Sequence, residues 1–335
     1  MEKLLSIKDL HVQYKTEDGI VYAVNGVNLE VFKGETLGLV GETGAGKTTT
    51  ALSILRLLPE RTGQITQGSI QLEGTDVLKA TEADMRAIRG NQVSMIFQDP
   101  MTSLNPIIPV GKQIEEALLL HTKLPASERG KKVDEMLEAV GLQPQRKNEY
   151  PHQFSGGMKQ RIVIAIALAC NPDLLLADEP TTALDVTIQA QVLQMMNNLK
   201  KTYQTGMILI THDLGVVAQT CDRVAVMYAG RIVEMGSAKN IYEAQEHHPY
   251  TEGLFHSIPE MNKDSDRLNP IPGLMPDPSV QTAGCSFCDR CPYAEERCWK
   301  EKPADYEKDG HMISCFRYAE KWNTAVAEEG GTCNE

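Results

Sequence analysis

One segment has the composition of a loop that binds phosphate groups. Gly41-Glu42-Thr43-Gly44-Ala45-Gly46-Lys47-Thr48 fits the pattern GxxxxGK followed by Ser or Thr, between the apolar run 37–40 and a helical pattern that begins at Thr49. Glycines let backbone N–H groups curl around a polyphosphate, and the start of the helix adds favourable partial charge. Lys47 can reach the terminal phosphates, and the Thr48 hydroxyl can bind Mg²⁺. The alternative is a glycine-rich turn without a ligand, but both flanks favour nucleotide binding.

A second segment supplies carboxylates for the same chemistry. Leu174 to Ala177 is an apolar strand that ends in Asp178 and Glu179. Asp178 is expected beside the phosphate loop, where a carboxylate holds Mg²⁺ through water. Glu179 is the expected general base that polarises the attacking water. Alone, two acids at a strand end would more simply be solvated, but together with a phosphate loop they predict nucleotide hydrolysis.

The cysteines indicate a third site. Cys170 and Cys221 stand far apart, whereas the others fall close together near the end of the chain, at Cys285, Cys288, Cys291, Cys298, Cys315 and Cys333. A cytosolic chain keeps its thiols reduced, so this cluster predicts a metal site before it predicts disulfides. Four thiolates suit zinc or an iron–sulfur cluster, and the CxxC pairs around Cys288 favour zinc on a simple reading. Cys333 lies in a polar terminus and is expected to be free.

Length, charge and hydropathy limit the classes of protein to consider. The 335 residues suggest about two domains. Lys and Arg number 33 against 45 Asp and Glu, and the net charge of −12 disfavours a general nucleic-acid binder or a binder of anionic lipid. The longest apolar run, 162–170, is too short for the roughly 20 residues that cross a membrane, and residues 1–10 carry charges instead of a signal-peptide stretch. We expect a cytosolic chain, unless another protein holds it at a membrane.

The elements that must position these residues follow an α/β pattern. Short β-type runs alternate with helical stretches up to about Gly236, which predicts a sheet covered by helices. Strands are expected at 5–14, 24–31, 36–40, 68–72, 93–97, 174–177, 207–211, 223–228 and 231–235. The first three are expected to form an antiparallel meander at one edge, and the most apolar later ones to be central parallel strands.

Two regions depart from this alternation. Residues of about 100–171 show only helical spacing and predict a helical insertion. After about residue 241, prolines and then cysteines replace the periodic pattern, so little regular structure is expected and a cross-link or metal should supply stability. We therefore predict a nucleotide-binding domain over 1–240 and a cysteine-rich C-terminal extension over 241–335.

Three further segments make the nucleotide site specific. They are Phe154-Ser155-Gly156-Gly157-Met158-Lys159-Gln160-Arg161, Gln98 in Phe97-Gln98-Asp99-Pro100, and His212 in Ile210-Thr211-His212-Asp213. In this order and spacing, the sequence resembles the nucleotide-binding subunits of ATP-binding-cassette (ABC) transporters. The resemblance implies a P-loop NTPase fold with an antiparallel β edge and a helical subdomain, and it implies ATP and Mg²⁺ as ligands.

The same resemblance implies roles for individual residues. Ser155, Gly156 and Gly157 belong to a signature loop that contacts ATP held by the opposite subunit, and Asp185 to a loop at the dimer seam. Gln98 senses Mg²⁺ and the attacking water, and His212 contacts the γ-phosphate. Tyr14 stacks on adenine, with Tyr22 as a competing candidate. Phe154 and Met158 depart from the commonest LSGGQ form but leave the Ser and Gly groups in place.

Motifs beyond the cassette narrow the resemblance. They are His248-Pro249-Tyr250-Thr251, Ser257-Ile258-Pro259, Ile271-Pro272-Gly273, Pro276-Asp277-Pro278 and Gly284-Cys285. With them, nearly the whole chain resembles the ATPases of dipeptide, oligopeptide and nickel importers, most of all the D-type subunits of bacterial dipeptide importers. This implies ATP hydrolysis that energises peptide import, two permease subunits, an extracytoplasmic peptide-binding protein, and a second, similar ATPase in a heterodimer at the cytoplasmic face of the cell membrane.

The resemblance also bears on the cysteines and leaves rivals. Relatives place a 4Fe–4S cluster on the cysteines that match Cys285, Cys291, Cys298 and Cys315, while zinc remains the alternative and Cys288 leaves the ligand set open. Nickel import is a rival cargo, because the ATPase does not contact the substrate. A non-transport ABC ATPase acting on nucleic acid is a rival class. It would predict basic stripes or a second cassette, and a net charge of −12 with one cassette argues against both.

Overall fold

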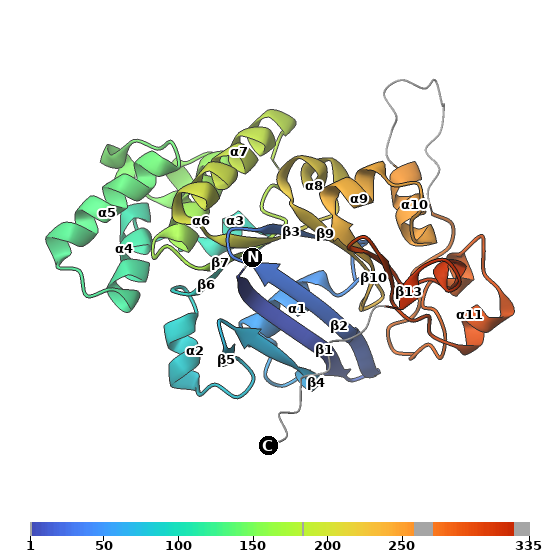
Figure 1. The fold of residues 1–335 in the computed structure, drawn as a ribbon. Helices are drawn as coiled ribbons and strands as arrows, with labels where there is room; N and C mark the ends of the chain where they lie inside the picture. The colour runs from blue at the N-terminus through green and yellow to red at the C-terminus, as the bar shows by residue number, and fades with distance from the viewer. Residues whose placement is uncertain (1, 183, 258–270, 325–335) are drawn as a thin grey trace, which may run out of the picture.

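The described part of the chain contains two β-sheets (Figure 1). The computed structural model describes residues 2–182, 184–257 and 271–324, so Ala183, Ile258, Pro259 and Cys333 lie outside the described residues. The smaller sheet is antiparallel, with the order β2 (Gly19–Phe32), β1 (Lys3–Thr16), β4 (Gly63–Leu72) and β5 (Thr75–Asp76). The larger sheet has the order β13 (Asn323–Thr324), β11 (Tyr306–Lys308), β12 (His311–Ile313), β10 (Arg231–Ser237), β9 (Arg223–Tyr228), β3 (Thr36–Val40), β8 (Gly206–Thr211), β7 (Leu174–Asp178) and β6 (Val93–Ile96).

The strands predicted from the sequence are present, but one was assigned to the wrong place. Residues 36–40, expected in the antiparallel meander, form β3 at the centre of the larger sheet, parallel to both β8 and β9. All five residues of β3 are buried, because the strand is covered on both faces. The antiparallel strands β1, β2 and β4 instead make a sheet of their own.

The larger sheet separates two apolar cores. Successive side chains of a strand point to opposite faces, so Ile208 and Ile210 of β8 enter one core and Met207 and Leu209 the other. The first core also contains the smaller sheet and α1 (Lys47–Ile54), which is thereby packed between the two sheets. This packing fixes the segment that links β3 to α1, which is the predicted phosphate loop.

Helices cover the sheets and fill the segment between β6 and β7. The helix α2 (Glu82–Ile88) precedes β6. The segment between β6 and β7 contains α3 (Pro100–Ser103), α4 (Val110–His121), α5 (Ala126–Ala139) and α6 (Gly156–Leu168), with 3₁₀ turns at Pro144–Asn148 and Pro151–Gln153. The predicted helical insertion is confirmed. It lies at one end of the molecule, opposite the C-terminal extension (Figure 1). The helices α7 (Val186–Tyr203), α8 (Leu214–Thr220) and α9 (Ala238–Glu243) follow.

The C-terminal extension is more regular than its composition predicts. It contains α10 (Pro249–His256), α11 (Glu296–Lys300), and 3₁₀ turns at Cys288–Arg290 and Phe316–Tyr318. Its strand β12 pairs antiparallel with β10, in the register Glu234 with Ile313, so the extension continues the larger sheet. Most of residues 271–324 lie outside helices and strands, as expected. The short strands were missed because they form only by pairing with the edge of β10, and they are too short to be recognised by periodicity. No described helix is both long and apolar enough to span a membrane.

Candidate functional site

The phosphate loop (residues 41–48) follows β3 and ends at the first turn of α1. Glycine is required at two of its positions. A Cβ on Gly41 would lie 2.1 Å from the Met227 carbonyl oxygen, and one on Gly46, which has φ +104°, would lie 2.4 Å from the Ala23 carbonyl oxygen. Thr43, Gly44 and Thr48 face solvent, whereas Ala45, Gly46 and Lys47 are buried. The loop therefore presents one open side to a ligand while the other packs against the sheet.

Lys47 is held over the loop by the loop itself. Its ammonium donates to the carbonyl oxygens of Gly41 at 2.7 Å and of Glu42 at 2.9 Å. Burial lowers the pKa of Lys47, and the nearby carboxylates of Glu179 and Asp178 oppose that shift. A buried cation without a full counter-charge at a helix N-terminus is suited to an anionic ligand.

Asp178 lies where the carboxylate for Mg²⁺ is expected. The Thr48 hydroxyl donates to Asp178 Oδ2 at 2.8 Å, which brings the end of β7 to the phosphate loop across the intervening strand β8. Burial raises the pKa of Asp178, and the Thr48 bond counteracts part of this effect. A hydroxyl and a carboxylate oxygen in contact are the ligand types that Mg²⁺ uses in phosphate sites.

Glu179 contacts three other polar side chains of the site. The Gln98 amide donates to Glu179 Oε2 at 3.1 Å, the Thr182 hydroxyl to the same oxygen at 2.9 Å, and His212 Nδ1 lies 3.1 Å from Oε1. Burial acts to raise the pKa of Glu179, but the bonds from His212 and Thr182 outweigh it, and the pKa lies below its ordinary value. The backbone of Glu179 has φ +46°, an uncommon conformation that is concentrated at functional sites. An ionised, oriented carboxylate results, as a general base requires.

The predicted adenine contact and signature residues occupy different surfaces. The Tyr14 hydroxyl lies 3.2 Å from Thr49 Oγ1 of α1, so its ring borders the loop. Ser155, Gly156, Gly157 and Asp185 line an open depression formed by the starts of α6 and α7, which includes no phosphate-loop residue. Asp185 also caps α7, because its carboxylate accepts from the Ile188 N–H at 2.9 Å. The chain thus carries two separate surfaces, one at the phosphate loop and one at α6.

The predicted metal ligands converge in the C-terminal extension. All described cysteines are free thiols, and Cys285, Cys291, Cys298 and Cys315 line one small cavity together with Cys288. Burial raises the pKa of Cys315 to about 12, and the neighbouring Cys285 and Cys291 add to the effect. The thiol of Cys288 turns toward Asp289 Oδ1, 3.8 Å away.

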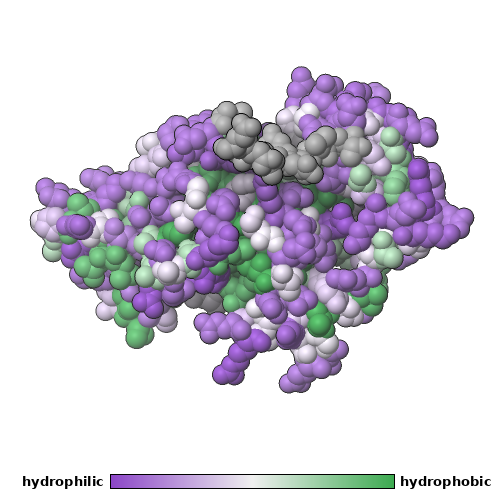
Figure 2. Space-filling view, turned by 60° about the horizontal axis from the view of Figure 1, so that its bottom comes forward, coloured by the Kyte–Doolittle hydropathy of each residue, from purple (hydrophilic) through white to green (hydrophobic). Residues whose placement is uncertain are grey.

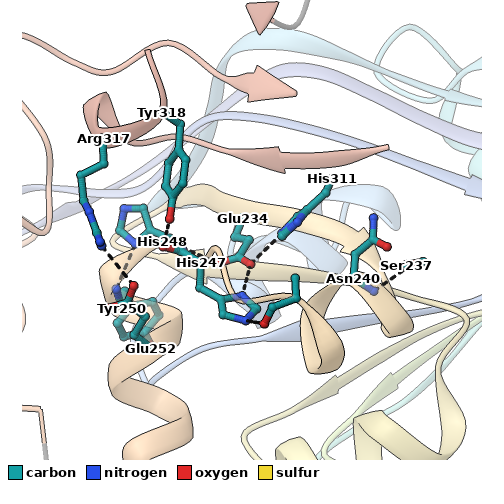
Figure 3. Close-up of polar contacts among 11 residues, drawn as sticks. Glu234, Ser237, Asn240, His247, His248, Tyr250, Glu252, His311, Arg317 and Tyr318 are labelled. Atoms are coloured by element: carbon teal, nitrogen blue, oxygen red, sulfur yellow. Dashed lines mark hydrogen bonds and ion pairs between the residues drawn. The ribbon is translucent and has the colours of Figure 1, made fainter. Parts of the chain in front are cut away.

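A buried ion-pair network, which the sequence did not reveal, joins the extension to β10. His247 Nδ1 and His311 Nε2 each lie 2.8 Å from Glu234 Oε1, and the His248 N–H donates to Oε2 at 2.8 Å (Figure 3). His247 Nε2 faces the Ala244 carbonyl oxygen at 2.9 Å. Both ring nitrogens of His247 therefore face acceptors, an arrangement that favours the doubly protonated imidazolium. Burial acts to lower the pKa of His247, but Glu234 raises it overall.

The fold and this site define the class of the protein. A phosphate loop between β3 and α1, a strand-end carboxylate against Thr48, and a glutamate bonded to Gln98 and His212 make an ATP-hydrolysing cassette of the ABC type. The chain matches the family described as ABC transporter over residues 24–182. It resembles a dimeric structure of a post-hydrolysis state of the ATP-binding cassette MJ0796 bound to ADP and Pi, with TM-score 0.63, 28% identity, and 70% of this chain and 99% of that chain covered.

The curated relatives fix the family within that class. A second match, described as the C-terminal region of oligopeptide/dipeptide transporters, covers residues 233–298. The chain is 48% identical to the dipeptide transport ATP-binding protein DppD of Bacillus subtilis (strain 168), covering 97% of this chain and 98% of that protein. It is 46% identical to the oligopeptide transport ATP-binding protein OppD of Escherichia coli (strain K12), covering 96% and 95%. The chain belongs to the ATP-binding subunits of the oligopeptide and dipeptide ABC transporters.

Several residues of the site gave no recognisable signal in the sequence. Thr182 reaches Glu179 only because the chain turns sharply after β7. Glu234, His247 and His311 lie far apart in sequence, and their three ligand atoms come within 4.8 Å of one another only in the folded chain. The type of the histidines gave little signal, since His is intermediate in how often it is buried.

Proposed function

We propose that the chain is the ATP-hydrolysing subunit of a bacterial ABC importer for dipeptides or oligopeptides. The observation that carries this proposal is the match of residues 233–298 to the C-terminal region of oligopeptide/dipeptide transporters, because the cassette alone is common to many kinds of cargo. The proposal assigns the nucleotide-binding work to residues 1–240 and treats 241–335 as the extension particular to these transporters.

The proposed hydrolytic mechanism uses the groups at the phosphate loop. The N–H groups on the open side of residues 41–49 and the Lys47 ammonium bind the phosphates, while the Glu42 N–H donates to the Tyr250 hydroxyl instead. Thr48 with Asp178 would hold Mg²⁺. Glu179 accepts the proton of the attacking water, Gln98 orients that water, and His212 contacts the γ-phosphate from its exposed position. Tyr14 stacks on the adenine. Preorganised donors around the loop supply most of the transition-state stabilisation.

The proposed active unit is a dimer of cassettes. The depression at Ser155, Gly156 and Gly157 is separate from the phosphate loop of the same chain, so each ATP is completed by a partner's signature loop, with Asp185 at the seam. The start of α6 leaves N–H groups unsatisfied, which suits it to a γ-phosphate. We propose a second, similar ATPase as the partner, which makes the dimer a heterodimer.

The proposed transport partners are two permease subunits and an extracytoplasmic peptide-binding protein. Exposed apolar side chains support a protein contact on the helical insertion and next to Gln98, where Phe97 is 45%, Ile107 80% and Leu120 70% exposed. Figure 2 shows hydrophobic surface on the helical lobe, at the left of the view. Through these contacts the chain is held as a peripheral protein at the cytoplasmic face of the membrane.

Uptake of a labelled dipeptide tests the proposed function. In cells that lack this chain, the wild type restores uptake and Glu179→Gln does not, because the amide cannot accept the proton. Glu17→Gln is the matched control, since Glu17 is an exposed residue in the turn between β1 and β2. Uptake that never depends on the chain contradicts the peptide assignment, and nickel uptake in the same strains then tests the rival cargo.

We further propose a 4Fe–4S cluster on Cys285, Cys291, Cys298 and Cys315. The donor set fits, because the four thiols surround one cavity and interact with one another in pairs. A tetrahedral zinc site with bonds of about 2.3 Å brings its sulfurs roughly 3.8 Å apart. The zinc alternative therefore requires the sulfurs to lie closer together than a cluster does. When bound, the cluster would cross-link the extension, and ATP hydrolysis requires no electron from it.

Elemental analysis of anaerobically purified protein tests the cluster. Iron and acid-labile sulfide are expected in equal amounts, and both are expected to fall in Cys291→Ser but not in the control Cys170→Ser. Zinc without sulfide would support the alternative metal. A wild-type chain that holds neither metal contradicts both assignments.

A further inference from the structure

Residues 285–298, here called the cysteine segment, reach the phosphate loop through one arginine. Arg290 lies between Cys288 and Cys291, and its side chain is only 6% exposed. Its Nη1 donates to Glu42 Oε2 at 3.0 Å and its Nη2 to Glu42 Oε1 at 3.2 Å. Two parallel bonds between a guanidinium and a carboxylate are among the strongest and most directional contacts in proteins. Glu42 is the second residue of the phosphate loop, so this pair joins the two predicted sites directly.

A second contact holds the backbone of the same residue. The Glu42 N–H donates to the Tyr250 hydroxyl at 2.9 Å, and Tyr250 is fully buried. The Tyr250 ring packs against Tyr228, with centroids 4.6 Å apart, and against Phe287, with centroids 5.5 Å apart. Because Phe287 belongs to the cysteine segment, the position of Tyr250 depends on that segment too. Lys47 binds the Glu42 carbonyl, so the N–H, carbonyl and carboxylate of Glu42 are all fixed.

Arg290 is anchored independently of Glu42. Its Nε donates to the Pro272 carbonyl oxygen at 3.0 Å, and Nη1 lies 3.3 Å from the Tyr228 hydroxyl. The guanidinium also lies 5.7 Å from the Tyr228 ring centroid and 5.9 Å from that of Phe287. A side chain held at so many points loses little entropy when it binds Glu42, so it can impose a position on the loop.

Charge gives the contact a second effect. Glu42 places a carboxylate in a loop whose ligand carries several negative charges, and like charges at short range disfavour binding. Arg290 neutralises that carboxylate and keeps it turned toward the extension. Without Arg290, the loop would lose one support and regain one repulsive charge, and both changes weaken nucleotide binding.

We propose that Arg290 and Tyr250 are positioning residues for the phosphate loop, through which the fold of the cysteine segment sets the affinity for ATP. This inference rests on the proposed function, because it assumes that the loop binds ATP.

ATP binding by the purified full chain tests the proposal. Arg290→Gln is expected to raise the dissociation constant for MgATP about tenfold, the loss expected for one charge-assisted bidentate contact. Arg290→Lys keeps the charge without the fork geometry and is expected to recover part of that loss. Arg297→Gln is the matched control, because Arg297 lies in the same segment but is exposed and pairs with Glu295. Iron content and thermal unfolding, measured for each variant, report whether the extension remains folded.

A double-mutant cycle separates positioning from general damage. In a Glu42→Gln background the carboxylate is gone, so adding Arg290→Gln is expected to change affinity less than threefold. An equal loss in both backgrounds, or an Arg290→Gln chain that is folded and binds ATP like the wild type, overturns the proposal. If the wild type itself does not bind ATP and Lys47→Ala changes nothing, the proposed function fails instead.

Discussion

The cassette and the C-terminal extension are stabilised in different ways, although both contact the phosphate loop. In the cassette, fully buried strands alternate their side chains between two apolar cores, as in β3 and β8. In the extension, short strands depend on the edge of β10, and specific pairs hold the segments between them, such as Glu234 with His247 and Arg290 with Glu42. Apolar burial is spread over many residues, so a single substitution removes only a small part of it. A polar pair, in contrast, is lost entirely when either partner is substituted. The extension should therefore be the region where single substitutions and solution conditions reach the ATP site.

The largest expected effect is catalytic and confined to the cassette. Glu179→Gln is expected to lower ATP turnover by about 10²–10⁴-fold, the usual contribution of a general base. Its free energy of unfolding should change little, since the substituted amide can still bond Gln98 and Thr182. Steady-state hydrolysis and urea denaturation measure the two quantities. Turnover within tenfold of the wild type would exclude Glu179 as the base.

The next effect concerns the fold of the extension. Glu234→Gln leaves the buried His247 without a counter-charge and is expected to lower the free energy of unfolding by about 3 kcal/mol. Glu243→Gln, a change at an exposed side chain nearby, is expected to cost less than about 0.5 kcal/mol. Urea denaturation at neutral pH compares the two. Equal stability of both variants would mean that the buried ion pair adds no more stability than an exposed carboxylate does.

The same network should make the stability of the extension depend on pH. Burial acts to raise the pKa of Glu234, but the bonds from His247 and His311 lower it to about 2, so its contribution is present above about pH 4.5 and is lost toward about pH 2. Burial acts to lower the pKa of His247, yet Glu234 raises it overall, so that contribution is present below about pH 6.5 and is lost as pH rises through the raised pKa.

It follows that the stability difference between the wild type and Glu234→Gln should be largest between about pH 4.5 and 6.5. Denaturation at about pH 3 and 9 measures the stability difference where it should be reduced, and denaturation at about pH 5.5 measures it where it should be largest. A difference that is constant across this range would contradict the ion-pair assignment.

The smallest expected effect tests whether damage within the cassette stays local. Thr81 caps α2, where its hydroxyl accepts from the Asp84 N–H at 3.2 Å. Thr81→Ala is expected to cost about 1 kcal/mol of stability. Affinity for MgATP should remain at the wild-type value, in contrast to Arg290→Gln. A parallel loss of affinity in both variants would remove the distinction between the two regions.

The cassette could be predicted from sequence because its signals are local. The glycines and Lys47 of the loop stand in one segment, and Asp178 and Glu179 end an apolar strand, so residue type and spacing sufficed. Parallel strands buried on both faces also gave recognisable apolar runs, although the same property hid that residues 36–40 belong to the centre of the larger sheet. A local pattern indicates which residues share a face of a strand, but not which strands become neighbours in the sheet.

The extension could not be predicted in the same way. The cysteine set was visible as a type and a spacing, but the contacts of Arg290 with Glu42 and of His311 with Glu234 join residues 248 and 77 positions apart. Such pairs are created by tertiary packing and leave no periodic trace. Tyr250 was noted as part of a motif, yet its bond to the Glu42 N–H emerged only from the folded chain.

The most direct test of the central claim is ATP-driven transport by the assembled complex. The assay places the chain, the proposed permeases and the proposed partner ATPase in proteoliposomes, with the proposed binding protein and labelled dipeptide on the opposite side. ATP supplied to the cassette side should then drive accumulation of the dipeptide. Glu179→Gln in this chain should abolish accumulation, while Glu17→Gln should leave it intact. Accumulation that proceeds without ATP, or that is unchanged by Glu179→Gln, would contradict the account.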